Sequence, residues 1–320
     1  MSHRAAINAL RDYLATVIIG QQHLIERLLM ALLADGHLLV EGAPGLAKTK
    51  AIKMLATGLE ANFHRIQFTP DLLPADVTGT DIYRPENGTF QFQQGPIFHN
   101  LVLADEINRA PAKVQSALLE AMAERQVSVG KQTYLLPELF LVMATQNPIE
   151  QEGTYPLPEA QLDRFLLHVL IDYPDAAAER QILQLARGEA KSHSPTPLSE
   201  PVSQASIFAV RQEILDLHMA DSVMEYIVQL IQASRHPAEY DKQAANWIEY
   251  GASPRGTIAL DRCARTYAWL NDKDFVSPDD VQAVVHDVLR HRLLLSFEAE
   301  AEGISPQQVI DKLISVVPIA

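Results

Sequence analysis

The sequence lacks the features that mark secreted proteins and membrane proteins. Its 320 residues include one cysteine, Cys263, so an intrachain disulfide is excluded and a reducing compartment is indicated. No apolar run approaches the roughly 18 residues that a membrane-spanning helix needs. The N-terminal segment has no apolar core of the kind found in signal peptides. These absences predict a cytoplasmic protein without direct membrane insertion.

Positive charge is also scarce. The chain has 26 lysines and arginines against 40 acidic residues, which gives a formal net charge of −14. Non-specific DNA binding needs a face rich in lysine and arginine, so no DNA partner is expected. A content of 48% hydrophobic and 21% charged residues is ordinary for a globular protein. The length allows about two domains.

A glycine-rich segment near the N-terminus points to phosphate binding. Residues 38–49 read L-L-V-E-G-A-P-G-L-A-K-T, an apolar run followed by a tight turn and a helix start. Backbone N–H groups of such a turn bind a phosphate chain, with Lys48 at the β/γ-phosphates and the Thr49 hydroxyl on Mg²⁺. The alternative is a tight strand-to-helix turn in another kind of α/β protein. The expected nucleotide contacts are Gly42, Ala43, Pro44, Gly45, Leu46, Ala47, Lys48, Thr49 and Lys50.

Ala47 departs from the strict phosphate-loop pattern, which has glycine before the lysine. If that position needs a positive φ, alanine costs about 1–2 kcal/mol relative to glycine. If φ is negative, alanine costs little and stiffens the loop.

A second motif carries two adjacent acids. Residues 101–106 read L-V-L-A-D-E, an apolar strand that ends in Asp105 and Glu106. Asp105 can orient Mg²⁺ or its waters, and Glu106 can polarise an attacking water. The alternative is a strand whose acids cap the next segment. Together with the phosphate loop, the pair predicts Mg²⁺-dependent hydrolysis of ATP.

The remaining chain alternates between strand and helix patterns. Strands are expected at His37–Glu41, Phe63–Phe68, Leu101–Ala104, Leu139–Ala144 and Phe165–Ile171, and helices at Lys48–Leu59, Ala112–Glu124 and Ala176–Ala186. This order predicts a parallel sheet covered on both faces, with ligands at the carboxyl ends of its strands.

The character of the chain changes near residue 188. A polar, proline-containing stretch follows, and after it the pattern is helical. We expect an α/β nucleotide-binding core over residues 1–188, a linker over 189–205 and a smaller all-α domain over 206–320. Its helices are expected at Ile207–Leu217, Ser222–Ser234, Pro254–Leu270 and Pro278–Leu289.

Two β-hairpins interrupt the α/β pattern. Asn87-Gly88 between alternating residues is a strong turn signal, and residues 126–137 again read as strand, Gly-Lys turn and strand. Alternation places Phe90 and Phe92 on one face of the first hairpin. The hairpins either form a structural edge or contact a substrate or a neighbouring subunit.

Three further polar residues are candidates for the site. Asn147 ends the strand that follows the acids and could orient water, or it could belong to an ordinary Asn-Pro turn. Arg164 could pair with Asp163 or Glu159, or could project toward the γ-phosphate of a neighbouring subunit. Arg255, in the first turn of a helix, opposes the helix dipole, which favours a phosphate contact.

The chain resembles the MoxR family of AAA+ ATPases over about residues 5–295. The resemblance rests on I-I-G-Q (18–21), G-A-P-G-L-A-K-T (42–49), F-T-P-D-L-L-P-A-D-V-T-G (68–79), F-Q-Q-G-P-I-F (92–98), L-A-D-E-I-N-R-A (103–110), A-T-Q-N-P-I-E-Q-E-G-T-Y-P-L-P-E-A-Q-L-D-R-F (144–165) and G-A-S-P-R-G (251–256). Ala47 is usual in this family.

The resemblance implies a P-loop AAA+ core with inserted β-hairpins, followed by an all-α lid. It places adenine at Ile19 and Gly20, and it assigns Asn147 as first sensor, Arg164 as the arginine finger and Arg255 as second sensor. It also implies a homo-oligomer, usually a hexameric ring, with ATP between subunits. Chaperone-like maturation of protein clients is implied, often with von Willebrand factor A-domain partners.

Three other functions remain to be compared with this one. A magnesium-chelatase-like motor subunit shares the inserted hairpins and differs in its client. A nucleotide-gated scaffold would assemble with little turnover, which the presence of both Glu106 and Arg164 opposes. A DNA-remodelling ATPase is opposed by the net charge and by the lack of the G-A-F-T-G-A loop.

Overall fold

The computed structural model describes residues 2–149, 153–189, 198 and 200–319. The chain forms two compact units, one of Met1–Arg164 with Val169–Phe208 and one of Phe165–His168 with Ala209–Ala320. The predicted linker over residues 189–205 lies partly outside the described residues, and its limits stay a prediction. No helix in the described part of the chain is long and apolar enough to cross a membrane.

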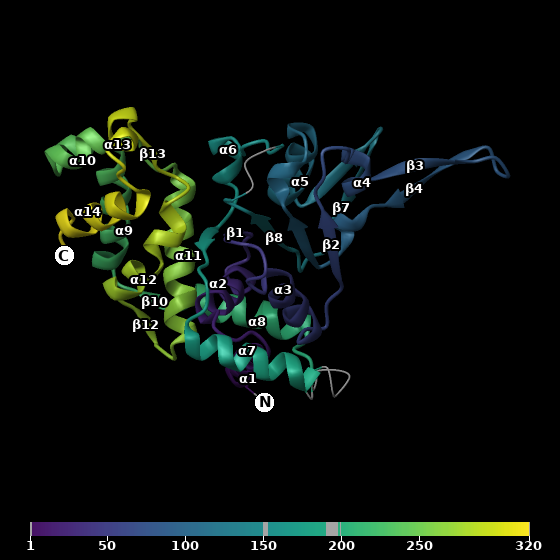
Figure 1. The fold of residues 1–320 in the computed structure, drawn as a ribbon, viewed down its shortest axis with the longest axis horizontal. Coiled ribbons are helices and arrows are strands. Elements are labelled where there is room, and N and C mark those ends of the chain that lie inside the picture. The colour runs from purple at the N-terminus through teal and green to yellow at the C-terminus, as the bar shows by residue number, and fades with distance from the viewer. Residues whose placement is uncertain (1, 150–152, 190–197, 199, 320) are drawn as a thin grey trace. The chain divides into compact units, whose positions relative to one another are not determined.

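The first unit is built on a five-stranded sheet with the strand order β2-β5-β8-β1-β9 (Figure 1). The strands are β1 (Leu38–Glu41), β2 (Phe63–Gln67), β5 (Leu101–Asp105), β8 (Leu141–Gln146) and β9 (Leu167–Leu170). The pairs β1–β8, β5–β8 and β2–β5 are parallel. Leu38, Met143 and Leu103 form one row across the three central strands. The predicted parallel sheet is therefore confirmed, with β8 starting two residues later than expected.

Burial explains why these segments form the centre of the sheet. All residues of β5 are buried, as are all but the last residue of β1 and of β8. Continuous apolar burial is typical of a parallel sheet that is covered on both faces. The polar residues that end these strands are consequently brought to one edge of the sheet.

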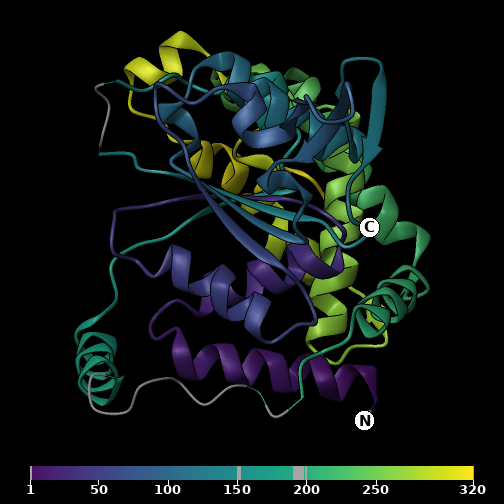
Figure 2. The same ribbon diagram turned by 90° about the vertical axis from the view of Figure 1, so that its right-hand side faces the viewer.

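Helices cover this sheet and carry the loops of the site. They are α1 (His3–Val17), α2 (Gln22–Leu33), α3 (Lys48–Thr57), α4 (Pro74–Thr78), α5 (Ala112–Glu124), α6 (Glu159–Leu162) and α7 (Ala176–Glu189). Helix α8 (Gln204–Leu215) begins in the first unit and continues in the second. The short 3-10 helices η1 (Pro96–Phe98) and η2 (Ile107–Arg109) follow β4 and β5. In α1 the residues Ile7, Leu10, Leu14 and Val17 are buried, and their spacing places them on one apolar face of the helix. Helices α1, α2 and α3 contact one another and form one group, purple and blue in Figure 2.

Both predicted hairpins are present in the first unit. The first pairs β3 (Gly79–Arg84) with β4 (Thr89–Gln94), and the second pairs β6 (Gln126–Val129) with β7 (Gln132–Leu135). Gly88 and Gly130 have φ of 60°, the conformation for which glycine is favoured in such turns. The β3–β4 hairpin extends away from the sheet of its unit (Figure 1).

The second unit is mainly helical, as expected. It contains α9 (Asp221–Arg235), α10 (Lys242–Trp247), α11 (Pro254–Leu270), α12 (Pro278–Leu289), α13 (Phe297–Ala301), α14 (Pro306–Val316) and the 3-10 helix η3 (Pro237–Glu239). Two short strand pairs accompany them, β10 (His218–Met219) with β12 (Phe275–Val276) and β11 (Ile248–Tyr250) with β13 (Leu294–Leu295). These strands were not predicted because two or three residues are too few to show a period.

Capping residues fix the start of two predicted helices of this unit, α11 and α12. The Ser253 hydroxyl accepts a hydrogen bond from the backbone N–H of Arg255, and Pro254 occupies the first position of α11. Ser277 and Asp280 form a reciprocal capping box at the start of α12. Cys263 is fully buried within α11.

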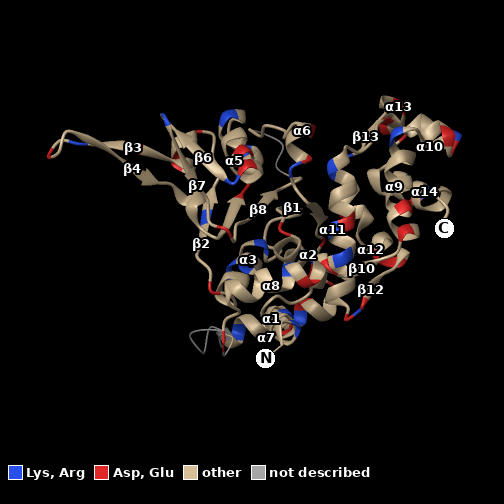
Figure 3. Cartoon of the chain, turned by 180° about the vertical axis from the view of Figure 1, so that it is seen from behind, with Lys and Arg blue, Asp and Glu red and all other residues tan. Residues whose placement is uncertain are grey.

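Charge is distributed without segregation by sign. Figure 3 shows lysines and arginines interspersed with aspartates and glutamates along the helices of each unit.

Candidate functional site

The phosphate loop, Gly42–Thr49, joins the end of β1 to the start of α3. Gly45 has φ of 85° and Ala47 has φ of 59°, both left-handed. Ala47 is therefore in the conformation that costs an alanine about 1–2 kcal/mol. At Gly42 any Cβ would lie 2.4 Å from Ile171 Cγ1, so only glycine fits there. The loop has the geometry that the sequence motif requires, with a strained residue immediately before the lysine.

Lys48 extends from the first turn of α3 back across the loop. Its Nζ donates to the backbone oxygen of Gly42 at 2.6 Å and lies 3.4 Å from the backbone oxygen of Gln146. Burial lowers the pKa of Lys48 below its ordinary value, and the charges of Asp105 and Glu106 oppose this shift. Glu41 acts in the same direction as the two acids. The lysine and both acids thus belong to one electrostatic cluster at the strand ends.

Asp105 ends β5, and its carboxylate accepts hydrogen bonds from side chains of the two neighbouring strands, β2 and β8. Arg65 on β2 binds Oδ2 through Nε at 2.9 Å and through Nη2 at 2.7 Å. The Thr145 hydroxyl on β8 donates to Oδ1 at 2.6 Å. Asp105 is buried, so these charge-assisted bonds fix its orientation in a medium of low polarity. One lone pair of Oδ1 is left for a further donor.

Glu106 lies next to Asp105 in a left-handed conformation with φ of 56°. Its backbone N–H donates to Thr145 Oγ1 at 2.9 Å. Its Oε2 accepts hydrogen bonds from Gln67 Nε2 at 2.8 Å and from Arg109 Nη1 at 3.0 Å. Strained backbone of this kind clusters at functional sites, where surrounding contacts hold it in place.

The other predicted polar residues occupy different surroundings. Asn147 is buried after β8, and its Oδ1 accepts from the backbone N–H of Ile149 at 3.2 Å, as in a local turn. Arg164 Nη1 donates to the backbone oxygen of Leu119 on α5 at 2.8 Å. Its Nε is buried without a hydrogen-bond partner among the described residues. Arg255 is exposed and belongs to the second unit.

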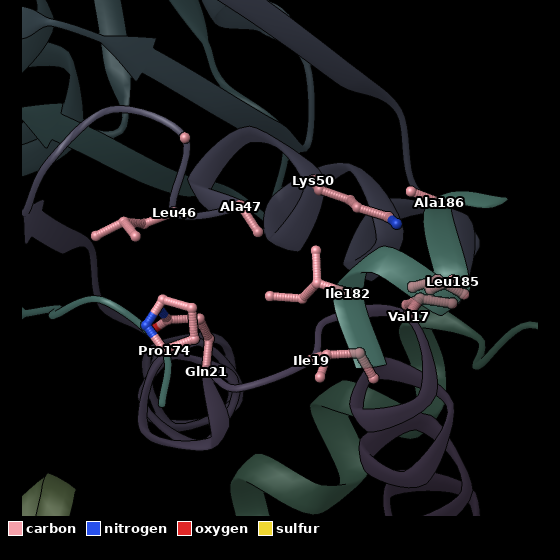
Figure 4. A pocket seen from close by; sticks show the side chains of 11 residues that line it. Val17, Ile19, Gln21, Leu46, Ala47, Lys50, Pro174, Ile182, Leu185 and Ala186 are labelled. Atoms are coloured by element: carbon pink, nitrogen blue, oxygen red, sulfur yellow. The ribbon is translucent and has the colours of Figure 1, made fainter. Parts of the chain in front are cut away.

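A small apolar cavity of about 130 Å³ adjoins the phosphate loop (Figure 4). Its lining comprises Val17, Ile19, Gln21, Gly45, Leu46, Ala47, Lys50, Pro174, Ile182, Leu185 and Ala186. Ile19 lines this cavity and Gly20 does not. A Cβ at Gly20 would lie 2.9 Å from Ala178 Cβ of α7. The adenine role of both residues stays a prediction. Ile182 and Leu185 of α7 were not predicted to take part.

Gln21 adds one oriented polar group to this cavity. The side chain is buried, and its Nε2 donates to the backbone oxygen of Asp172 at 3.0 Å. A carbonyl can only accept, so the orientation of the amide is fixed. Apolar walls with a few oriented polar groups are typical of a small-molecule site.

Sequence reasoning missed Arg65, Gln67, Arg109 and Thr145. Arg109 could have been predicted from the sequence, because it lies three residues after Glu106 in the same motif. In the structure it forms an i,i+3 ion pair with Glu106. Arg65 and Gln67 are brought to the acids by the pairing of β2 with β5, in which Gln67 is opposite Asp105. That register cannot be read from either strand alone.

The geometry defines a P-loop nucleotide-binding protein, and comparison with known proteins supplies its family. Residues 37–167 match the ATPase family associated with various cellular activities (AAA), and residues 241–313 match the AAA lid domain. The Chaperone MoxR1 of Mycobacterium tuberculosis is 44% identical over 304 residues, covering 95% of this chain and 79% of that protein. The Protein MoxR of Paracoccus denitrificans is 34% identical over 95% of this chain and 93% of its own.

A solved structure has the same fold over nearly the whole length of this chain. The crystal structure of a candidate ATPase from Cytophaga hutchinsonii superposes with a TM-score of 0.92 and 47% identity, covering 99% of this chain and 96% of that one. The chain belongs to the MoxR family of AAA+ ATPases.

Proposed function

We propose that this chain hydrolyses ATP with Mg²⁺ in a hexameric ring and uses the cycle to remodel or mature protein clients. Von Willebrand factor A-domain proteins are the proposed partners. The observation that carries the enzymatic part is the convergence of Lys48, Asp105 and Glu106 at the carboxyl ends of β1 and β5, which both pair with β8. A cation for phosphate, a carboxylate for the metal and a carboxylate for water are the parts that phosphoryl transfer requires.

The donor set fits a hard cation. Mg²⁺ takes oxygen ligands and usually keeps several of its waters. The Thr49 hydroxyl lies at the start of α3, and Asp105 retains acceptor capacity on Oδ1 beside its bond from Thr145. When bound, Mg²⁺ neutralises charge on the phosphate oxygens. Thr49 would bind it directly, and Asp105 would act on it or on its waters.

The remaining roles in nucleotide binding and hydrolysis are assigned to individual residues. The N–H groups of the phosphate loop and Lys48 hold the phosphates, and the cavity around Ile19 takes the adenine. Glu106 orients the attacking water with Asn147 as first sensor. Arg255 acts as second sensor.

Arg164 is proposed to act on the nucleotide of a neighbouring subunit. It donates from Nη1 to Leu119 within its own chain. The finger role therefore uses Nη2 or needs a change of rotamer when subunits associate. A finger supplied by a neighbour contributes about 10³–10⁵ in rate in other ATPases and GTPases.

Complementation between variants tests both the site and the ring. Lys48→Ala should lose ATP binding, and Arg164→Ala should bind ATP normally and lose most turnover. Mixtures of the two should recover part of the activity, because one subunit then supplies an intact loop and the other an intact finger. Mixtures that co-assemble by size-exclusion chromatography and recover no hydrolysis would contradict a finger that acts between subunits.

One observation favours a second candidate, an assembly scaffold with little turnover. Both Gln67 and Arg109 bind Oε2 of Glu106, so the proposed water-orienting group is restrained in this conformation. The steady-state turnover number of the assembled protein with saturating ATP separates the two functions.

A further inference from the structure

A basic segment of the second unit holds the backbone that follows Arg164. This clamp segment, Arg290–Arg292, comes directly after α12. Arg292 Nη2 donates to the backbone oxygen of Phe165 at 2.6 Å, and Nη1 donates to that of Leu166 at 3.2 Å. One planar guanidinium therefore spans two successive carbonyl oxygens.

Its two neighbours add contacts to the same strip of backbone. His291 Nε2 donates to the oxygen of Phe165 at 3.1 Å, and Arg290 Nη1 donates to that of His168 at 2.8 Å. His291 is buried, and burial holds its pKa well below the ordinary value, with Arg292 acting in the same direction. The imidazole is therefore neutral at pH 7 and carries its proton on Nε2. Three successive side chains thus bind the carbonyl oxygens of Phe165, Leu166 and His168.

The clamped strip is joined directly to Arg164. Successive Cα atoms are about 3.8 Å apart across a trans peptide, so Phe165 cannot shift without carrying the backbone of Arg164 with it. The Arg164 side chain is anchored by a single described hydrogen bond, to Leu119. The position of its guanidinium therefore depends on where the clamp segment holds the following residue.

Arg292 also lies close to the turn that carries Arg255. Gly256, the next residue, is buried, and a Cβ there would lie 3.4 Å from Arg292 Cδ. The same side chain also donates from Nη1 to the backbone oxygen of Val288 in α12. Arg292 therefore lies between the first turn of α11 and the strip that follows Arg164.

We propose that Arg292 is a positioning residue for ATP hydrolysis, which links the α11 turn bearing Arg255 to the placement of Arg164. The inference rests on the proposed function, in which these two arginines act on phosphate. A shift of the α11 turn is passed by Arg292 to Phe165 and Leu166, and so to the finger. The nucleotide bound in one subunit thereby influences the position of Arg164, which acts on the nucleotide of the neighbouring subunit.

Arginine is required for this link because of its shape. Its rigid fork donates to two acceptors at once, whereas the ammonium group of lysine is a point charge on a flexible stem. Arg292→Lys keeps the charge and most of the packing volume but loses the two-pronged contact. Misplacement of a catalytic group by about 1 Å can cost about 10²-fold in rate.

The test compares Arg292→Lys with a matched control in the same unit. Arg265 also donates to a backbone oxygen, that of Leu217, and pairs with Asp261. Arg292→Lys should lower kcat about 10- to 100-fold, with ATP affinity, assembly and Tm close to the parent. Arg265→Lys should leave kcat within about twofold. Equal losses of kcat in the two variants would overturn the proposal.

A double-mutant cycle with Arg164→Ala distinguishes a role of Arg292 in positioning Arg164 from a purely structural role. If Arg292 acts through Arg164, the double variant hydrolyses ATP no more slowly than Arg164→Ala alone. Multiplicative losses would overturn the proposal while leaving the proposed function intact. A parent protein without ATP hydrolysis, or an Arg164→Ala variant with parental kcat, would instead overturn the proposed function and this inference with it.

Discussion

Gln67 and Glu106 are joined by a hydrogen bond of 2.8 Å between the side-chain amide of one and the carboxylate of the other. The bond connects β2 to the residue after β5, and Arg109 binds the same carboxylate oxygen at 3.0 Å. Two donors on one oxygen restrict the rotation of the carboxylate. The residue proposed to orient water is therefore restrained by its own chain.

Release of this restraint should raise the basal rate. We expect Gln67→Ala to increase the steady-state turnover of ATP several-fold, because Glu106 then retains only the Arg109 contact. ATP affinity should stay unchanged, since Gln67 makes no described contact with the phosphate loop. Gln212→Ala, an exposed position on α8, is the control. A lower turnover in Gln67→Ala would show that the bond positions the carboxylate productively.

The positive φ of Ala47 predicts a small gain in stability from glycine. Ala47→Gly relieves about 1–2 kcal/mol of backbone strain in the folded state. The substitution also lowers stability by about 0.4–1 kcal/mol, because glycine makes the unfolded chain more flexible. The net gain should therefore be below about 2 kcal/mol, read as a raised urea midpoint. Ala51→Gly, at a buried position of the helix α3 that follows the loop, should destabilise by about 1 kcal/mol. A lowered midpoint for Ala47→Gly would contradict the strain argument.

The two hairpins are tied together by one aromatic stack. The rings of Phe92 and Tyr134 have centroids 3.9 Å apart at an angle of 17°, and Phe92 also packs on Phe98. Phe90, two residues away, is 70% exposed. Phe92 therefore has a structural role, and Phe90 remains available for a client or a neighbouring subunit.

This contrast predicts opposite outcomes for two similar substitutions. Phe92→Ala should lower Tm and speed amide exchange in both hairpins, with a coupling energy to Tyr134→Ala of about 0.5–1.5 kcal/mol. Phe90→Ala should leave Tm unchanged. Equal Tm losses for the two variants would show that exposure does not separate their roles.

His291 should make folding stability sensitive to acid. Its folded pKa is held well below the ordinary value of 6.5 by burial, and then by the charge of Arg292, by His168 and by Arg290. Below about pH 6.5 the unfolded chain takes up a proton that the folded chain refuses, so stability falls as pH falls. The contribution of His291 to the slope of the unfolding free energy against pH approaches about 1.4 kcal/mol per pH unit.

A neutral substitute should flatten that dependence. His291→Gln can keep a donor to Phe165 and removes the titrating group, so the difference from the parent should shrink as pH falls from 7 to 5. His218→Gln, exposed in the same unit, should keep the parental slope. Urea midpoints measured at several pH values provide the comparison, and parallel curves for parent and His291→Gln would refute the assignment.

Local patterns were enough to predict the core of this structure. The apolar runs of β1, β5 and β8 are short and continuous, and Lys48 and Glu106 stand at fixed places in motifs whose chemistry is local. The helix start at Pro254 follows from Ser253 and the proline itself. These features depend on neighbours in sequence, so one sequence is sufficient to find them.

The parts that escaped prediction depend on contacts between distant segments. Arg65 reaches Asp105 across 40 positions, through the register of two parallel strands. Arg292 reaches Phe165 across 127 positions, and nothing around either residue marks the pairing. The cavity beside the phosphate loop likewise combines the loop before α2 with α7. Such relationships appear only when the chain is folded.

The central claim is that the site binds ATP through Lys48 and hydrolyses it through Glu106. Equilibrium binding of a fluorescent ATP analogue and single-turnover hydrolysis, measured together on Glu106→Gln, test this most directly. The account predicts binding within a few-fold of the parent and hydrolysis reduced by at least about 10²-fold, since charge at the water position is lost. Loss of binding in Glu106→Gln, or hydrolysis at the parental rate, would contradict it.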